Sequence, residues 1–457
     1  MEPRRSDKLK AESPEKHSGS GRAIVIGPYL RERAARESAP EAEIRRTPDA
    51  RLDEAVGLAL AIDLDVVDSG IVPLSQIRPA TYLGKGKAEE IAGLVKSNEA
   101  GLVVMDCALS PVQQRNLEKE FGAKVLDRTG LILEIFGKRA RTREGSLQVE
   151  LAHLTYQRSR LVRSWTHLER QRGGFGFLGG PGETQIETDR RLIGERISRI
   201  KLDLEGVKRT RALHRESRKR VPYPIVALVG YTNAGKSTLF NRLTEATVLS
   251  ADMLFATLDP TLRAIDLPHG NRIILSDTVG FISDLPTMLV AAFRATLEEV
   301  IEANLILHVR DVSHGDAEAQ SGDVRDVLKE LGIDPDAGKL IEVWNKLDRL
   351  PEHERERLTN LAKRQTPAPV LVSALTGEGI GALKALIEDK LGETRRKFEV
   401  TLEAAEGADA SWLYRNVEVL DKTVNQDDGT LVMQVRVDAA NEGILTAKFG
   451  ARVKALG

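Results

Sequence analysis

The chain has little of what marks secreted or membrane-embedded proteins. Its 457 residues include one cysteine, Cys107, so no disulfide can form within the chain, and this cysteine usage fits a reducing cytosol. No apolar run reaches the length of a transmembrane helix. Residues 1–20 lack the apolar core of a secretion signal, and their acidic residues argue against a transit peptide. We therefore expect a cytoplasmic protein in which the polar residues 1–20 form a disordered tail.

The net charge of −1 conceals an uneven distribution of charge along the chain. Residues 138–220 contain 21 Lys and Arg against 10 Asp and Glu, so the remainder of the chain is acidic. A basic block in an acidic chain indicates contact with a polyanion, although a solvated helical face would also account for it.

Two runs of apolar residues within this block alternate between four-residue and three-residue spacing, which is the pattern of a coiled coil. The runs cover 147–168 and 186–207, and we expect two antiparallel helices of about 24 residues each. Between them, six of the eleven residues at 172–182 are glycine, yet the segment also carries Phe175 and Phe177. Exposed rings beside arginines favour RNA as the partner of this tip, with a loop folded back on its own hairpin as the alternative.

A phosphate-binding motif lies at 230–237, after an apolar run at 224–229 that predicts a buried strand. Its spacing, G-x-x-x-x-G-K-S, lets backbone N–H groups surround phosphates at the start of a helix predicted over 236–243. We expect Lys236 to reach the β- and γ-phosphates and Ser237 to bind Mg²⁺; the motif alone leaves ATP and GTP open. The residues expected around the phosphates are Gly230, Tyr231, Thr232, Asn233, Ala234, Gly235, Lys236, Ser237 and Thr238.

Two later motifs select guanine. Asn-Lys-Leu-Asp at 345–348 follows an apolar run, and the Asp348 carboxylate can accept from N1–H and the exocyclic amine of guanine, a pair of donors that adenine lacks. At 373–375, after another strand-like run, a backbone N–H can donate to guanine O6. The residues expected around the base are Asn345, Lys346, Asp348, Ser373, Ala374 and Leu375.

Asp-Thr-Val-Gly at 277–280 ends a strand-like segment at 272–276 and predicts a sensor of the γ-phosphate. We expect Asp277 to hold Mg²⁺ through a water and the Gly280 N–H to meet the γ-phosphate. Fast GTPases often place a water-orienting glutamine directly after this motif, but here the residue is Phe281. Intrinsic hydrolysis is therefore expected to be slow, and something outside the simplest site must complete it.

A threonine between these motifs is expected to bind Mg²⁺ only when GTP is present. Thr257 is favoured and Thr261 is the alternative, with Phe255 expected beside the nucleotide. The residues expected to carry hydrolysis are Lys236, Thr257 and Gly280, and the expected direct Mg²⁺ ligands are Ser237 and Thr257. Since every motif follows a predicted strand, a parallel α/β sheet would bring these loops to one edge.

The expected fold class is α/β, with a doubly wound P-loop GTPase sheet at its centre. Short parallel strands are predicted at 23–26, 102–105 and 124–126, and a lysine-rich turn at 81–87 precedes a helix through 96. That turn could bind phosphate, but a plain helix start is the favoured interpretation.

Near the end, strands are predicted at 397–404 and 431–437, with a helix at 412–422. The expected parts are a disordered tail at 1–20, an N-terminal α/β domain at 21–137, a basic helical hairpin at 138–221, a GTP-binding domain at 222–396 and a small C-terminal α/β domain at 397–457.

These motifs together resemble the HflX family of GTPases, over nearly the whole chain from about residue 21. The most specific match is GGFGFLGGPGETQIETDRR at 173–191, because this segment is not a general GTPase motif. The other matching segments are YLGKGK at 82–87, GYTNAGKST at 230–238, LFATLDPTLR at 254–263, DTVGFI at 277–282 and NKLD at 345–348.

The resemblance implies binding to the 50S ribosomal subunit, through 23S rRNA near the peptidyl-transferase centre, and splitting of stalled or idle 70S ribosomes, notably after heat stress. It also implies GTP/GDP and Mg²⁺ as ligands, with hydrolysis stimulated by the ribosome and with the N-terminal domain and hairpin as the main contact. ATP binding and RNA unwinding are associated with the N-terminal domain of some members. Asn233 stands where some potassium-stimulated GTPases place asparagine, so K⁺ is a candidate accelerator. We expect a cytoplasmic monomer that is partly ribosome-associated.

Two other interpretations stay open on the residues alone. One is a GTPase that matures the large ribosomal subunit without splitting 70S ribosomes. The other is a signalling switch whose coiled-coil hairpin binds a protein. Sedimentation of ribosomes distinguishes an assembly GTPase from a splitting factor, because only a splitting factor converts 70S ribosomes into subunits. Replacement of the arginines around the hairpin tip distinguishes both of these ribosome-binding GTPases from the signalling switch.

Overall fold

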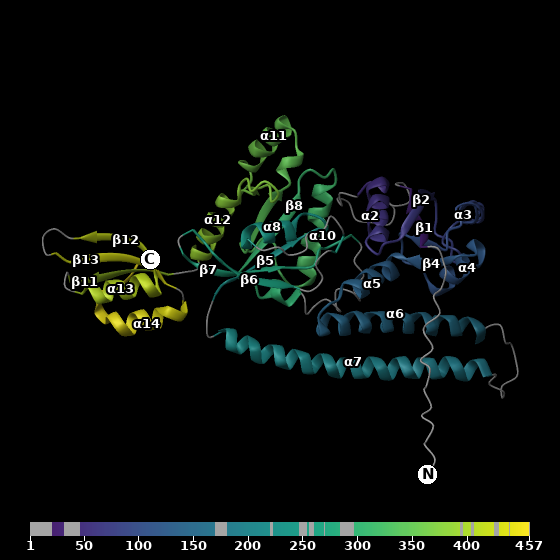
Figure 1. Ribbon diagram of the computed structural model, residues 1–457, viewed down its shortest axis with the longest axis horizontal. Helices are drawn as coiled ribbons and strands as arrows, with labels where there is room; N and C mark the ends of the chain where they lie inside the picture. Colours follow the sequence, from purple (N-terminus) through teal and green to yellow (C-terminus); the bar gives the residue numbers. More distant parts are fainter. Residues whose placement is uncertain are drawn as a thin grey trace, which may run out of the picture. The chain divides into compact units, whose positions relative to one another are not determined.

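The computed structural model divides the chain into two compact units, one of residues 1–39 and 51–131 and the other of residues 40–50 and 132–457. The finer boundaries at 138, 222 and 397 stay predictions. Figure 1 shows the elements of both units in sequence colours. The residues that the structure describes are 21–31, 46–169, 181–219, 223–245, 254–255, 260–268, 270–283, 297–393, 396–403, 406–424, 429–437 and 439–456.

The first unit is built on a four-stranded parallel sheet in the order β2-β1-β3-β4. The three short strands predicted at 23–26, 102–105 and 124–126 are confirmed, whereas β2 had not been predicted. β1 is a nearly continuous buried run, as expected for a parallel strand covered on both faces. The strands are β1 (Arg22–Leu30), β2 (Asp65–Leu74), β3 (Leu102–Met105) and β4 (Lys124–Asp127), and the helices between them are α2 (Pro48–Leu60), α3 (Lys85–Ser97) and α4 (Pro111–Phe121).

Helix α4 shows how local sequence sets its bounds. The Ser110 side chain accepts from the backbone of Gln113, whose side chain accepts in return from the Ser110 backbone, so the first turn is capped from both sides. The helix ends at Gly122, where φ of 64° is left-handed and is available to glycine at little cost.

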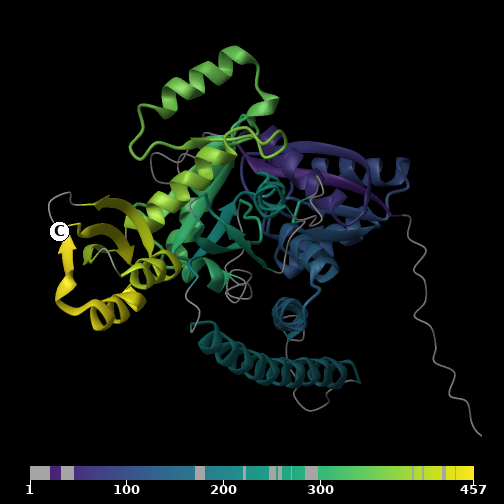
Figure 2. The same ribbon diagram turned by 60° about the vertical axis from the view of Figure 1, so that its left-hand side comes forward.

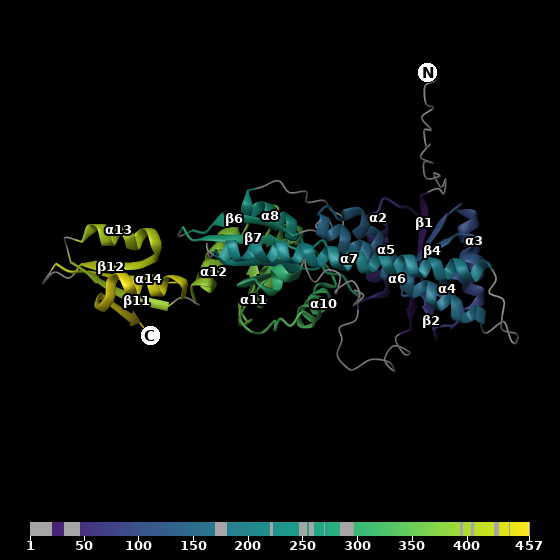
Figure 3. The ribbon, with the colours of Figure 1, turned by 90° about the horizontal axis from the view of Figure 1, so that it is seen from below.

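Two long helices follow a shorter one, α5 (Arg128–Arg139). Helices α6 (Arg143–Glu169) and α7 (Pro181–Lys219) run side by side in Figures 1 and 3, and Arg196 of α7 donates to both carboxylate oxygens of Glu150 on α6, at 2.7 and 2.9 Å. The antiparallel hairpin is therefore confirmed. The expected length of about 24 residues was too short, because α6 has 27 residues and α7 has 39. Most of the predicted glycine-rich tip, 172–182, lies outside the described residues.

The central sheet has six strands in the order β10-β9-β8-β5-β7-β6. All neighbours are parallel except β6 and β7, so one antiparallel edge strand completes a doubly wound sheet. Chain order changes direction at β5, which lies between β7 and β8. The strands are β5 (Ile225–Gly230), β6 (Thr261–Asp266), β7 (Arg272–Asp277), β8 (Leu305–Asp311), β9 (Leu340–Asn345) and β10 (Val370–Leu371), and the helices are α8 (Lys236–Thr244), α10 (Ala317–Glu330), α11 (Glu352–Ala362) and α12 (Ile380–Glu393).

The last part of the chain forms an antiparallel sheet in the order β12-β13-β11-β14 (Figures 1 and 2). Alternate residues of β11 and β13 are buried, and α13 and α14 bury Leu413, Leu445 and Phe449 in the same apolar cluster. The two helices therefore cover one face of the sheet. The elements are β11 (Arg396–Leu402), α13 (Gly407–Asn416), β12 (Glu418–Val424), β13 (Leu431–Val437), α14 (Ala439–Phe449) and β14 (Val453–Leu456).

One prediction in this part is wrong. A helix was expected over 412–422, but α13 ends at Asn416 and the residues that follow form strand β12. β12 pairs with β13, and Glu418 lies opposite Arg436, whose Nη1 is 3.5 Å from Glu418 Oε1. Backbone pairing with a neighbouring strand therefore overrides the helical pattern.

The described residues contain no helix that is both long and apolar enough to cross a membrane. The longest helix, α7, is rich in charged side chains along its whole length.

Candidate nucleotide-binding site

The loop between β5 and α8 approaches the rest of the central sheet closely. Gly235 has φ of 91°, and a Cβ atom there would lie 2.3 Å from Asn345 Nδ2, so only glycine fits. The helix α8 begins at the next residue, Lys236, and its N-terminus is where backbone N–H groups are available to an anion. Asn233 is exposed in the same loop with a left-handed φ of 59°, and Thr238 is half-buried on α8.

Lys236 is held inside this loop with only 6 % of its surface exposed. Its Nζ donates to the backbone oxygens of Gly230 at 3.1 Å and Tyr231 at 2.8 Å. Burial lowers the pKa of Lys236 to about 8, with the Asp277 carboxylate opposing that shift and the charge of Lys346 adding to it. The charged amine is therefore poorly stabilised by its surroundings, and a bound anion would stabilise it.

Ser237 and Asp277 meet at the start of α8. The Ser237 hydroxyl donates to Asp277 Oδ2 at 2.7 Å, and Asp277 is fully buried at the end of β7. A hydroxyl and a carboxylate are oxygen donors of the kind that Mg²⁺ prefers. Two of the three residues that were predicted to serve Mg²⁺ therefore lie together.

The loop after β7 packs against the phosphate-binding loop. A Cβ atom at Gly280 would lie 2.9 Å from Thr232 Cα and 3.0 Å from Lys236 Nζ, so the Gly280 backbone lies directly beside the buried amine. The Phe281 N–H donates to the Gly230 oxygen at 3.1 Å, and the Phe281 oxygen accepts from the Thr232 N–H at 2.7 Å. The ring of Phe281 is buried, with 1 % of the residue exposed, so it presents no group that could orient water.

Asn345 joins the phosphate-binding loop to the loop after β10. Its Nδ2 donates to the Ala234 oxygen at 2.9 Å, and its Oδ1 accepts from the Ala374 N–H at 3.0 Å. The neighbouring Lys346 forms an ion pair with Asp311 at 2.8 Å. One buried side chain therefore fixes the distance between two loops that are far apart in the sequence.

Asp348 and Ser373 lie in contact, with the serine hydroxyl donating to Asp348 Oδ1 at 2.5 Å. Leu375 of the same loop is 66 % exposed. Arg242 of α8 was not predicted, and it donates to the oxygen of Ala374 at 3.1 Å and to the oxygen of Leu375. No sequence motif marks Arg242, because its role depends on a loop more than a hundred residues later.

The segment expected between these motifs is only partly described. Thr257, the favoured Mg²⁺ ligand, lies outside the described residues, and Thr261 begins β6. Phe255 is 2 % exposed, and its ring meets that of Phe136 edge-on with ring centroids 4.7 Å apart. Packing against another ring therefore accounts for the burial of the Phe255 side chain.

In the first unit, the lysine-rich turn before α3 is a helix start. Lys85 lies 3.7 Å from Glu89, and Lys87 donates to Glu90 at 2.6 Å, both within the helix. These exposed pairs account for the lysines without a phosphate ligand. The turn is therefore a plain helix start with exposed lysine–glutamate pairs.

The first unit also holds a buried polar network at the ends of its strands. Asp106 accepts from Arg128 at 2.5 Å and from the Tyr29 hydroxyl at 2.6 Å, and Arg128 also pairs with Glu54. Burial and the nearby Asp106 raise the pKa of Tyr29. The groups bond to one another, so the network is explained as part of the folded core.

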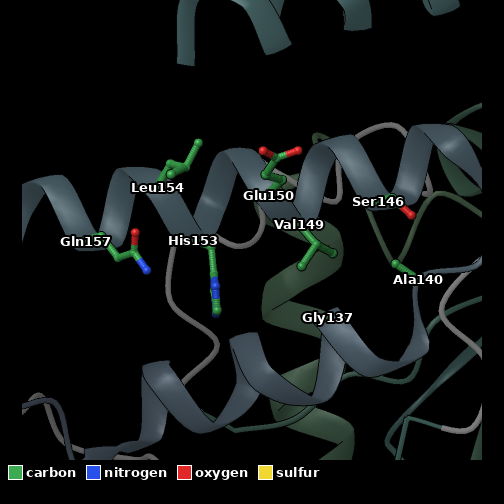
Figure 4. Close-up of a pocket in the computed structure, with 8 residues that line it drawn as sticks. All are labelled: Gly137, Ala140, Ser146, Val149, Glu150, His153, Leu154 and Gln157. Carbon is green, nitrogen blue, oxygen red and sulfur yellow. The ribbon is translucent and has the colours of Figure 1, made fainter. Parts of the chain in front are cut away.

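A separate cavity of about 290 Å³ lies between the end of α5 and the first half of α6 (Figure 4). His153 lines it and its Nε2 is 3.6 Å from Glu134, while Gly137 and Ala140 leave room on the α5 side. The cavity shares no residue with the loops described above.

Comparison with known proteins covers most of the chain. The matching family models, by their descriptions, are GTP-binding GTPase N-terminal at 49–137, GTP-binding GTPase Middle Region at 139–218, 50S ribosome-binding GTPase at 225–346 and HflX C-terminal domain at 358–456.

Among curated relatives, GTPase HflX of Magnetococcus marinus is 51 % identical over 425 residues, which cover 92 % of this chain and 94 % of the relative. GTPase HflX of Escherichia coli is 48 % identical over 359 residues, 79 % of this chain and 83 % of the relative. A crystal structure described as an SsGBP and GDP complex is 23 % identical, with 81 % of this chain and 98 % of that chain covered and a TM-score of 0.47.

Proposed function

Since the chain belongs to the HflX family of GTPases, we propose that it binds and hydrolyses GTP at the loops 230–238, 277–280, 345–348 and 373–375. The observation that carries the proposal is the position of Asn345, whose side chain bonds to both Ala234 and Ala374. A phosphate-binding loop and a base-binding loop must keep a fixed separation to hold one nucleotide. Asn345 fixes that separation.

In this proposal, the phosphates lie at the N-terminus of α8. The backbone N–H groups of the loop and the charged Lys236 amine bind them, and the Gly280 N–H meets the γ-phosphate. Gly280 is suited to this because it already packs beside Lys236 Nζ. Mg²⁺ would be held by Ser237, with Asp277 acting through a water and Thr257 joining when GTP is bound; it would supply positive charge against the β- and γ-phosphates.

Guanine would be recognised by Asp348 and by the loop after β10. The Asp348 carboxylate accepts from two guanine donors, and the Ala374 N–H or a neighbouring backbone N–H donates to O6. Ser373 supports this arrangement, because its hydroxyl holds the Asp348 carboxylate. This recognition excludes adenine, because adenine lacks the two adjacent donors that Asp348 would bind and the O6 acceptor that the backbone N–H would bind.

We propose that hydrolysis is slow in the isolated protein and that the ribosome accelerates it. Phe281 is buried and bonded through its backbone to the phosphate-binding loop, so it cannot orient the attacking water. A partner must then complete the site. K⁺, held near Asn233, is a candidate for part of that contribution.

The proposed partner is the 50S subunit, through 23S rRNA near the peptidyl-transferase centre, and the proposed outcome is splitting of 70S ribosomes, including under heat stress. Two observations support this: the central part of the chain matches a 50S ribosome-binding GTPase family, and the block 138–220 that contains the helices α6 and α7 is strongly basic. A cytoplasmic, monomeric protein that is partly bound to ribosomes fits this role.

Sedimentation of 70S ribosomes tests the proposal. The protein with a non-hydrolysable GTP analogue should convert 70S ribosomes into subunits, whereas the protein with GDP should not. With GTP, which the protein can hydrolyse, each protein molecule should split 70S ribosomes repeatedly. Binding to 50S without loss of 70S would instead favour a GTPase of subunit assembly, and absence of ribosome binding would contradict both.

A further inference from the structure

Arg46, which precedes α2, belongs to the second unit and contacts the nucleotide loops from outside the motifs. Its Nη1 donates to the Tyr231 hydroxyl at 2.8 Å and to Ser283 Oγ at 3.1 Å. Its guanidinium carbon also lies 5.3 Å from the centre of the Tyr231 ring. One arginine therefore touches both the phosphate-binding loop and the segment that follows the γ-phosphate motif.

The contact is buried and charged. The Arg46 side chain is 8 % exposed, and its Nε lies 3.5 Å from Asp316 Oδ2, a carboxylate that is 15 % exposed. The Ser283 N–H donates to the same Tyr231 hydroxyl at 2.8 Å. Hydrogen bonds from a charged group in a low-dielectric site are stronger and more directional than those at a surface.

The two residues that Arg46 joins are close in sequence to the groups that would bind phosphate. Tyr231 supplies a backbone oxygen to Lys236 Nζ, and Ser283 lies three residues after Gly280. A shift of Tyr231 would therefore move the Lys236 amine, and a shift of Ser283 would move the Gly280 N–H. Only a nucleotide with a γ-phosphate needs both groups at once.

We propose that Arg46 is a positioning residue for the GTP-bound state, holding the loop 280–283 against the phosphate-binding loop so that the Gly280 N–H reaches the γ-phosphate. The residue acts through Tyr231 and Ser283, which its guanidinium contacts. The proposal rests on nucleotide binding at 230–238. It adds to that function a determinant of the preference for GTP over GDP.

Nucleotide affinities of Arg46→Ala test the proposal, with GDP and a non-hydrolysable GTP analogue measured by calorimetry in the full chain. Affinity for the analogue should fall about tenfold and affinity for GDP by less than about threefold, because the Gly280 N–H serves only the γ-phosphate, whereas Lys236 keeps its hydrogen bond to the Gly230 oxygen. Equal loss for both nucleotides, or no loss for either, would show that Arg46 has only a structural role or none.

A second variant keeps the test decisive if Arg46→Ala folds poorly. Tyr231→Phe keeps the ring but removes the hydroxyl that Arg46 and Ser283 share, so it should also lower the ratio of GTP-analogue to GDP affinity. Where Arg46→Ala folds well, the double variant should add little to it. An unchanged ratio in Tyr231→Phe would overturn the proposal.

The control is Arg51→Ala, which removes an arginine of α2 that stacks on the Tyr29 ring at 4.3 Å in the first unit. It should bind both nucleotides as the wild type does, and a selective loss there would contradict a specific role for Arg46. Wild-type protein that binds neither nucleotide would refute the proposed function itself, which is a different result from an unchanged affinity ratio in the variants.

Discussion

Guanine-nucleotide affinity should fall as pH rises from 7 to 8.5, because of the proton on Lys236. Burial lowers the pKa of this amine to about 8 in the structure, whereas bound phosphates would stabilise its charged form and raise the pKa. Binding therefore takes up a proton wherever the free amine is partly neutral. The contribution to affinity is complete below the lower pKa and is lost as pH rises through it.

The size of the effect follows from the pKa of about 8. About nine-tenths of the free amines carry the proton at pH 7 and about one quarter at pH 8.5, so affinity should weaken about fourfold, or about 0.8 kcal/mol. Beside several phosphate oxygens, the pKa of Lys236 in the complex is expected to lie well above 8.5. The affinities are compared only up to pH 8.5, because guanine loses its own N1 proton at higher pH.

Calorimetric titration with GDP at saturating Mg²⁺ measures both the affinity and the proton uptake. The heats in two buffers of different ionisation enthalpy should give uptake of about half a proton at pH 8 and about a tenth at pH 7. Lys346→Met should reduce the uptake at pH 8, because the Lys346 charge helps to lower the pKa of Lys236. An affinity that stays constant over this range, with no proton uptake at pH 8, would refute the reasoning.

Three further predictions concern the base, the loop that reads it and the hairpin tip. Asp348→Asn should shift preference from GTP toward XTP, since the amide donates where the carboxylate accepted; unchanged affinities for both would remove Asp348 from base recognition. Arg242→Ala should weaken GDP binding about tenfold, because the guanidinium holds two backbone oxygens of the base loop, and direct titration against wild type would detect this. Shortening 173–182 to a plain turn should leave GTP affinity near wild type but abolish 70S splitting, so wild-type splitting by that variant would exclude insertion of the tip.

Strands and helices of the central sheet were predictable within one or two residues where an apolar run ends in a motif. β5, β7 and β9 follow this pattern, because a buried parallel strand must be apolar along its length and polar where it opens onto a site. The residues at 418–424 do not follow it. The helix expected over 412–422 ends at Asn416 because pairing with β13 decides the conformation of the residues after it, and that pairing depends on a strand later in the chain.

By itself, the sequence was enough to predict a guanine-nucleotide site. The phosphate loop, the γ-phosphate motif and the guanine motifs each consist of a few consecutive residues. The spacing of those residues predicts a binding loop, because a strand, a loop and a helix form from local sequence. Only the tertiary structure decided how those pieces are held together. Asn345 bonds to residues 111 positions before it and 29 after it, and Arg46 bonds to Tyr231 across 185 positions. Contacts of such separation leave no periodic pattern in the chain, since either partner can be any side chain of suitable length and charge that the packed sheet brings within reach.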